Sequence, residues 1–223
     1  MTLKESFSKD NKKIVIPIGD PAGIGIEVIL KALYSKKFVE EVKPLLVGCQ
    51  KNIEIVYQSL RSKGLEEIAD PRNLEIRNLP FKGKLQEGHS TKETGTASFE
   101  WLTHATELVL EKKAKALVTA PIAKYAWHQA GFQYAGQTER LAEMASIKNP
   151  SMLFTAVSPT NGWRFNTLLA TTHIPFTKIS TQLTPQVVEK KLNALIIFCK
   201  KFKGNPLVAV AGLNPHAGEE GNI

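Results

Sequence analysis

Short apolar runs alternate with amphipathic segments of helical period along most of this 223-residue chain. The first run, residues 12–18, reads Lys-Lys-Ile-Val-Ile-Pro-Ile, and its β-branched residues are typical of a buried strand. A turn with three glycines follows at residues 19–25, and a helix is predicted directly after it. Because strands that are apolar on both faces must be covered on both faces, the pattern predicts an α/β fold with a largely parallel sheet and helices on both sides.

The same periodicities predict the remaining elements. Helices are predicted over residues 26–33, 53–60, 97–113 and 185–202, with shorter helical segments near 123–130 and 139–146. Strands are predicted over 42–47, 74–79, 114–119 and 206–211, and a hairpin-like pair over 152–157 and 165–171. Residues 1–11 are polar and are expected to form a flexible lead to one α/β region over residues 12–223.

The composition excludes several classes of protein. No stretch approaches the ~18 consecutive apolar residues of a membrane span, and the polar N-terminus does not have the pattern of a secretory signal. The two cysteines, Cys49 and Cys199, are far apart in apolar surroundings and are expected to be reduced core thiols of a cytoplasmic protein. The net charge of +8 suits an anionic ligand, but aromatic residues are not interleaved with the lysine clusters, so nucleic acid is not the expected partner.

Reactive side chains follow four of the predicted strands. Asp20 follows the first strand, Lys124 follows 114–119, His173 follows 165–171, and His216 follows 206–211. The carboxyl ends of parallel strands open on one edge of a sheet, where ligands bind in α/β proteins. The sequence therefore predicts a site at this edge that combines an acid, a lysine and two histidines.

The two histidines could hold a metal ion. His173 and His216 are too far apart in sequence for a local motif, so only the fold could bring them together. Two neutral imidazoles suit a divalent transition metal, which needs a third protein ligand and keeps a position open for substrate. Each histidine could equally be a hydrogen-bonded structural group. His89, His104 and His128 are not expected to supply the third ligand, since they fall in a loop and on predicted helices.

Three other features could bind phosphate, and each has a simpler alternative. The glycine-rich turn at 19–25 resembles a phosphate cradle, but it matches neither GxGxxG nor the P-loop and could be only a tight turn. Thr138 could cap the helix that follows it or bind phosphate at the free N–H groups of that helix. Lys124 could be a counter-charge or simply an exposed lysine.

Five segments in order resemble one enzyme family. They are GDPAGIGIE at 19–27, LVTAPIAK at 117–124, GQTE at 136–139, TTH at 171–173 and GLNPHAG at 212–218. Together they resemble the 4-hydroxythreonine-4-phosphate dehydrogenase family of vitamin B6 biosynthesis.

The resemblance implies an α/β/α fold like that of the isocitrate and isopropylmalate dehydrogenases, and a homodimer. It implies oxidation of 4-phosphooxy-L-threonine with NAD, followed by loss of CO2 to give 3-amino-2-oxopropyl phosphate. It also implies a divalent metal (zinc, magnesium or cobalt) held by three histidines. His173 and His216 match two of these, and Gln137 and Thr138 match the substrate-binding pair.

The chain departs from the family pattern in two respects. Many members have His-Thr where this chain has Gln137-Thr138, and glutamine carries no charge. Family members also continue beyond the position of Ile223, into a Tyr-His-Asp-Gln-Gly-like segment with the third metal histidine. We therefore expect a C-terminally truncated member that lacks the third ligand and much of the cofactor site. A dehydrogenase of another phosphorylated four-carbon hydroxy acid, or an inactive phosphate-binding chain, are the alternatives.

Overall fold

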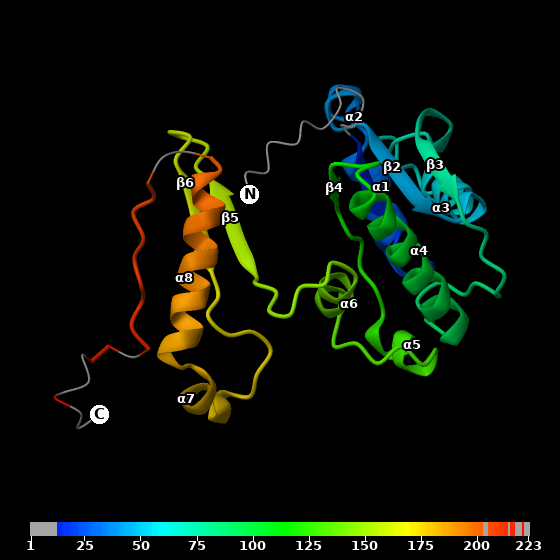
Figure 1. The fold of residues 1–223 in the computed structure, drawn as a ribbon. Helices are drawn as coiled ribbons and strands as arrows, with labels where there is room; N and C mark the ends of the chain where they lie inside the picture. Colours follow the sequence, from blue (N-terminus) through cyan, green and yellow to red (C-terminus); the bar gives the residue numbers. More distant parts are fainter. Residues whose placement is uncertain (1–12, 203–204, 214, 217–219, 221–223) are drawn as a thin grey trace. The chain divides into compact units, whose positions relative to one another are not determined.

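A computed structural model describes residues 13–202, 205–213, 215–216 and 220 of the chain (Figure 1). The chain divides into two compact units, residues 1–148 and 149–223, and each is described by itself. The predicted flexible lead, residues 1–11, lies outside the described residues.

A parallel sheet forms the centre of the first unit. Its strands are β1 (Ile14–Pro17), β2 (Pro44–Gly48), β3 (Glu75–Asn78) and β4 (Ala116–Leu117), in the order β3-β2-β1-β4. Strand β1 pairs in parallel with both β2 and β4, and β2 pairs in parallel with β3. The carboxyl ends of all four strands therefore open on the same edge, as the sequence predicted.

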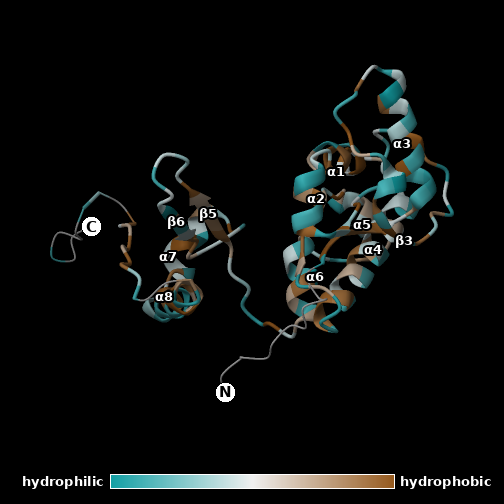
Figure 2. Cartoon of the chain, turned by 90° about the horizontal axis from the view of Figure 1, so that it is seen from above, coloured by the Kyte–Doolittle hydropathy of each residue, from teal (hydrophilic) through white to brown (hydrophobic). Residues whose placement is uncertain are grey.

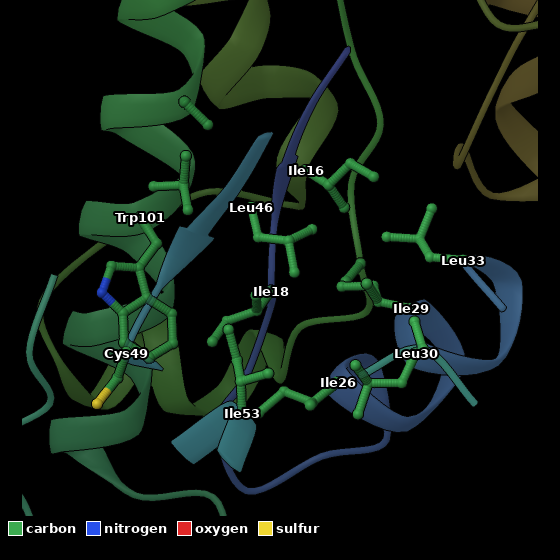
Figure 3. Close-up of a cluster of buried hydrophobic side chains, with 14 of the residues drawn as sticks. Ile16, Ile18, Ile26, Ile29, Leu30, Leu33, Leu46, Cys49, Ile53 and Trp101 are labelled. Atoms are coloured by element: carbon green, nitrogen blue, oxygen red, sulfur yellow. The ribbon is translucent and has the colours of Figure 1, made fainter. Parts of the chain in front are cut away.

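Helices cover both faces of this sheet. They are α1 (Gly25–Ala32), α2 (Lys36–Val42), α3 (Gln50–Ser62), α4 (Lys92–Leu110), α5 (Lys124–Gln129) and α6 (Gln137–Met144), with a 3-10 turn at Pro71–Asn73. Helix α4 packs on β1 and β2, and α1 packs against α3. Figure 3 shows Trp101 of α4 approaching the strands from the side opposite to Ile29 and Leu30 of α1. The predicted α/β class with helices on both faces is confirmed.

The first unit has a hydrophobic core between these layers. The side chains of Val15, Ile18, Leu30, Leu46 and Ile53 are fully buried there (Figure 3). Helix α2 was not predicted, because none of its residues is buried and it therefore has no apolar stripe to detect. Helix α4 begins earlier than predicted because Thr91 and Thr94 form a reciprocal capping box.

The second unit is a hairpin with helices beside it. Strands β5 (Leu153–Val157) and β6 (Arg164–Leu168) pair antiparallel, as predicted, and a 3-10 turn (Phe176–Lys178), α7 (Ile179–Gln182) and α8 (Pro185–Lys200) follow. Helix α8 lies on the hairpin, where the Asn166 amide nitrogen is 3.7 Å from the Cys199 sulfur. None of the described residues of this unit is buried, and Figure 2 shows hydrophobic colour along the exposed strand β5.

The predicted strand over residues 206–211 was wrong. These residues adopt no strand, and Leu207 and Val210 are exposed. An apolar run becomes a strand only where a neighbour pairs with its backbone, and in this unit β5 and β6 pair with each other.

The structure bears on two expectations from composition, and the one for the cysteines is met only in part. Both cysteines are free thiols, and Cys49 is buried as predicted, whereas Cys199 is half-buried. In the part of the chain that the structure describes, no helix combines the length and the apolar character needed to cross a membrane.

The core makes a direct prediction about stability. Leu46→Ala, in the centre of β2, should lower the free energy of unfolding by about 2–5 kcal/mol, because it leaves a cavity in a fully buried position. Val28→Ala, on the exposed side of α1, should change it by less than about 0.5 kcal/mol. Urea unfolding followed by circular dichroism measures both, and equal stability of the two variants would contradict this assignment of the core.

Candidate functional site

The glycine turn at residues 19–25 joins β1 to α1 and packs tightly against the end of β4. Gly19 has φ +76°, and a Cβ there would lie 2.3 Å from the Pro121 carbonyl oxygen. A Cβ on Gly25 would lie 2.4 Å from the Ile18 carbonyl oxygen. Both positions therefore require glycine for close backbone approach, which is the simpler of the two interpretations of this turn.

Asp20 is buried inside this turn. It is 2% exposed, and one carboxylate oxygen, Oδ1, accepts a hydrogen bond from the Ala22 amide at 2.9 Å. The Asp20 amide donates to the Pro121 carbonyl at 3.0 Å. Its other oxygen, Oδ2, is buried with no partner among the described residues. Buried carboxylate oxygens are normally hydrogen-bonded, so Oδ2 is the atom of this turn that is available to accept from a ligand or a water.

Gln137 and Lys124 lie beside the same segment. The Gln137 side-chain amide donates to the Ala120 carbonyl at 3.2 Å, one residue before the Pro121 carbonyl that binds Asp20. The Lys124 ammonium nitrogen lies 3.6 Å from where a Cβ on Gly136 would stand, which is just before α6. The structure thus brings Asp20, Lys124 and Gln137 together at the carboxyl edge of the sheet.

Thr138 is exposed at the second position of α6. The residue that precedes the helix as its N-cap is Gly136, and no side chain caps this end. Of the two roles left open for Thr138, capping the helix is therefore excluded. The free N–H groups and the positive end of the helix dipole remain open to an anion next to the Thr138 hydroxyl.

Arg140 fixes α6 to the rest of the unit. Its guanidinium lies 4.8 Å from the centre of the Phe99 ring and donates to the Thr103 hydroxyl at 3.3 Å, both on α4. It also donates to the Glu143 carboxylate at 3.1 Å, and the Tyr134 hydroxyl donates to the same carboxylate. These two hydrogen bonds hold the pKa of Glu143 below its ordinary value, and the bond to Glu143 raises the pKa of Tyr134.

The segment after β3 crosses the same edge and carries His89, which the sequence analysis set aside as a metal ligand and did not consider for phosphate. The Gly88 amide donates to the Ala22 carbonyl at 2.9 Å, and the Tyr125 hydroxyl donates to the Ser90 carbonyl at 3.1 Å. His89 lies between these two bonds and is exposed. Its place after a predicted strand was the signal that could have identified it, since the same signal identified Asp20 and Lys124.

The two predicted metal ligands belong to the second unit. His173 follows β6, is exposed and has φ +55°, in the left-handed region where histidine is enriched among non-glycine residues. His216 is also exposed. Among the described residues, no three or more His, Cys, Asp or Glu side chains are grouped as a metal site. The assignment of His173 and His216 as metal ligands stays a prediction.

Comparison with known proteins identifies the family. The family model for the pyridoxal phosphate biosynthetic protein PdxA matches residues 33–223. The chain belongs to the PdxA family. The 4-hydroxythreonine-4-phosphate dehydrogenase of Synechococcus sp. RCC307 is 52% identical over 211 residues, which are 95% of this chain and 63% of that protein. The enzyme of the same name from Synechococcus sp. JA-3-3Ab is 42% identical and is covered over 62% of its length.

Solved PdxA-family structures agree with the fold. The crystal structure of the Klebsiella pneumoniae 4-hydroxythreonine-4-phosphate dehydrogenase matches with a TM-score of 0.78 at 28% identity, over 95% of this chain and 66% of that chain. The chain spans less than two thirds of the length of the two curated relatives from Synechococcus sp. RCC307 and JA-3-3Ab.

Gly19 allows a test of the turn with a closely matched control. Gly19→Ala should destabilise the first unit, because the residue has positive φ and its new methyl group meets the Pro121 carbonyl. Gly64→Ala also sits at positive φ, +83°, but a methyl group added there would have no other atom within 4 Å. The control should cost only the backbone strain, roughly 1–2 kcal/mol. Thermal unfolding compares them, and an equal loss in both variants would contradict the close contact at Pro121.

Glu143 gives a prediction about pH. The pKa of Glu143 is lowered in the folded state, so its ionised form stabilises the fold fully at a pH above 4.5, the ordinary pKa of glutamate. This contribution is lost as the pH falls through the lowered, folded-state pKa. Glu143→Gln should therefore lower the melting temperature at about pH 7 and make little difference at about pH 3. Glu100→Gln on α4 is the control. A Glu143→Gln effect that is independent of pH would show that the charge does not matter.

Proposed function

We propose that this chain carries the phosphate-binding part of a 4-hydroxythreonine-4-phosphate dehydrogenase. The enzyme would oxidise 4-phosphooxy-L-threonine with NAD, and loss of CO2 would give 3-amino-2-oxopropyl phosphate in cytoplasmic pyridoxal phosphate biosynthesis. The observation that carries the proposal is the meeting of Asp20, Lys124 and Gln137 at one edge of the sheet. Membership of the PdxA family and the names of its relatives support the substrate.

The phosphate would bind at the start of α6. There the free backbone N–H groups and the Thr138 hydroxyl donate hydrogen bonds to it, and the Lys124 ammonium provides a positive charge. Gln137 has one N–H committed to the Ala120 carbonyl, so its carbonyl oxygen and its second N–H remain for the substrate. Asp20 Oδ2 is available to accept from a hydroxyl or an ammonium group of the substrate.

The divalent metal (zinc, magnesium or cobalt) would be held by His173, His216 and a third ligand. The described residues provide no third ligand grouped with these two, so they make an incomplete catalytic metal site. Such a metal would polarise the substrate hydroxyl, and NAD would accept the hydride. The glycine turn does not have the spacing of a dinucleotide fingerprint, so the role we assign to this chain's own residues is to bind and orient the phosphate.

A homodimer is part of the proposal, and the second unit supports it. The register of β5 and β6 puts Phe154 and Phe165 on the hairpin face opposite Asn166, the residue that meets α8. Both phenylalanines are more than half exposed. An apolar face of this kind is typical of a surface that another part of an assembly covers.

Two alternatives remain. The first is a dehydrogenase of another phosphorylated four-carbon hydroxy acid, such as erythronate or threonate phosphate, which the same phosphate site would accept. The second is a phosphate-binding chain without turnover.

A substrate panel tests the function. A protein extended to the length of its relatives should form NADH fastest from 4-phosphooxy-L-threonine, compared with erythronate and threonate phosphates. Turnover on none of these substrates would refute the dehydrogenase proposal, and a faster rate on a hydroxy acid without the amino group would favour the first alternative.

Thr138 tests the binding site in the same assay. Thr138→Val should raise KM about 10- to 100-fold with little change in kcat, because one hydrogen bond to a charged group is lost. Thr96→Val is the control, since the Thr96 hydroxyl donates only to the Lys92 carbonyl within α4. An unchanged KM in Thr138→Val would contradict phosphate binding at α6.

A further inference from the structure

We propose that His89 is a phosphate-binding residue of this site, and that its imidazolium provides a second positive charge beside Lys124. The inference rests on the proposed phosphate ligand, but it concerns a residue that neither the motifs nor the comparisons assign. It is argued from the two hydrogen bonds made by the residues next to His89, which are Gly88 and Ser90.

The position of His89 is fixed from both sides. The preceding residue, Gly88, donates its amide to the Ala22 carbonyl at 2.9 Å, and Ala22 in turn donates to Asp20. The following residue, Ser90, accepts from the Tyr125 hydroxyl at 3.1 Å, and Tyr125 adjoins Lys124 on α5. His89 is therefore held between the glycine turn and the start of α5, which are the two segments that border the proposed phosphate.

The imidazole of His89 is available to a ligand. The residue is exposed, and its ring makes no hydrogen bond or ion pair within the described part of the chain. The contrast is His128 on α5, whose ring nitrogen lies 2.9 Å from the Tyr134 carbonyl and is already used within the fold.

The charge of the site favours a histidine here. Within the linked segments 19–25, 88–90, 118–125 and 136–138, Lys124 is the one lysine, and there is no arginine. A phosphate monoester carries about −1.5 to −2 charges near neutral pH, so a single ammonium leaves part of its charge unmatched. An imidazole gains its proton in the same pH range and can donate from both ring nitrogens once charged.

Ionisable groups on the segment of His89 and on the neighbouring elements are part of the prediction. They are Asp20 on the glycine turn, Glu87 on its own segment, Lys92 and Glu93 at the start of α4, Lys124 and Tyr125 on α5, and Glu139 on α6. These neighbours influence His89 with or without a ligand. Only a change at His89 that appears when phosphate is added therefore indicates phosphate binding.

Nuclear magnetic resonance of the 223-residue chain provides that measurement. Inorganic phosphate is titrated in while the histidine ring signals and the Thr138 amide are followed, and the His89 signal is assigned by its loss in His89→Gln. We expect phosphate to raise the pKa of His89 and to shift the Thr138 amide over the same concentration range. A shifted Thr138 amide with an unmoved His89 signal would overturn the inference and leave the proposed phosphate site standing. If neither moves, both the inference and the phosphate site at α6 are refuted.

Phosphate affinity provides the second readout. His89→Gln should weaken binding about tenfold at about pH 6 and far less at about pH 8, because imidazoles in general carry a positive charge mainly at the lower of these pH values. His128→Gln, the same substitution in a histidine already engaged by the fold, should leave the affinity unchanged. Equal affinities for His89→Gln and the unmodified chain at the lower pH would overturn the inference.

Discussion

The hydrogen bond from the Asp20 amide to the Pro121 carbonyl joins the exits of two neighbouring strands, and the candidate site depends on it. It brings the glycine turn after β1 against the segment after β4, so close that Gly19 has no room for a side chain. The carbonyl one residue earlier in the chain, that of Ala120, accepts a hydrogen bond from the Gln137 side-chain amide. One dipeptide, Ala120–Pro121, thus positions an acid from one loop and an amide from the start of a helix.

The two units give this arrangement unequal support. In the first unit, α1, α3 and α4 enclose a fully buried core, and Arg140 attaches α6 to α4 through an aromatic ring and a hydroxyl. In the second unit no described side chain is buried, and a two-stranded hairpin is marginally stable without further cover. The groups that we propose to bind phosphate therefore lie on the better-packed unit, whereas His173 and His216 belong to the unit in which no described side chain is buried.

The sequence predicted the parallel sheet well, because its central strands β1 and β2 are apolar on both faces and because glycine must follow β1. It also predicted Asp20 and Lys124 at one edge of that sheet, but it placed His173 and His216 there as well, and these two belong to the second unit. It failed where the outcome depends on distant contacts. The run at 206–211 has the composition of a strand but no strand to pair with it in its unit, and Thr138 has the chemistry of a cap although Gly136 occupies that position. His89 was considered only as a metal ligand and was set aside because it falls in a loop, and the hydrogen bonds that its neighbours make with Ala22 and Tyr125 show its place.

Phosphate binding and redox chemistry are separable in a chain built this way. Every group that we assign to the phosphate lies in residues 19–138, within the unit that has its own core. In the function that we propose, the metal and NAD would act at the hydroxyl and carboxylate of the substrate and not at its phosphate. Gln137 carries no charge, and Lys124 and His89 are the residues on the linked segments that we propose to supply positive charge to the phosphate. On this proposal, residues 19–138 would hold the phosphate end of the substrate independently of the residues that hold the metal and NAD.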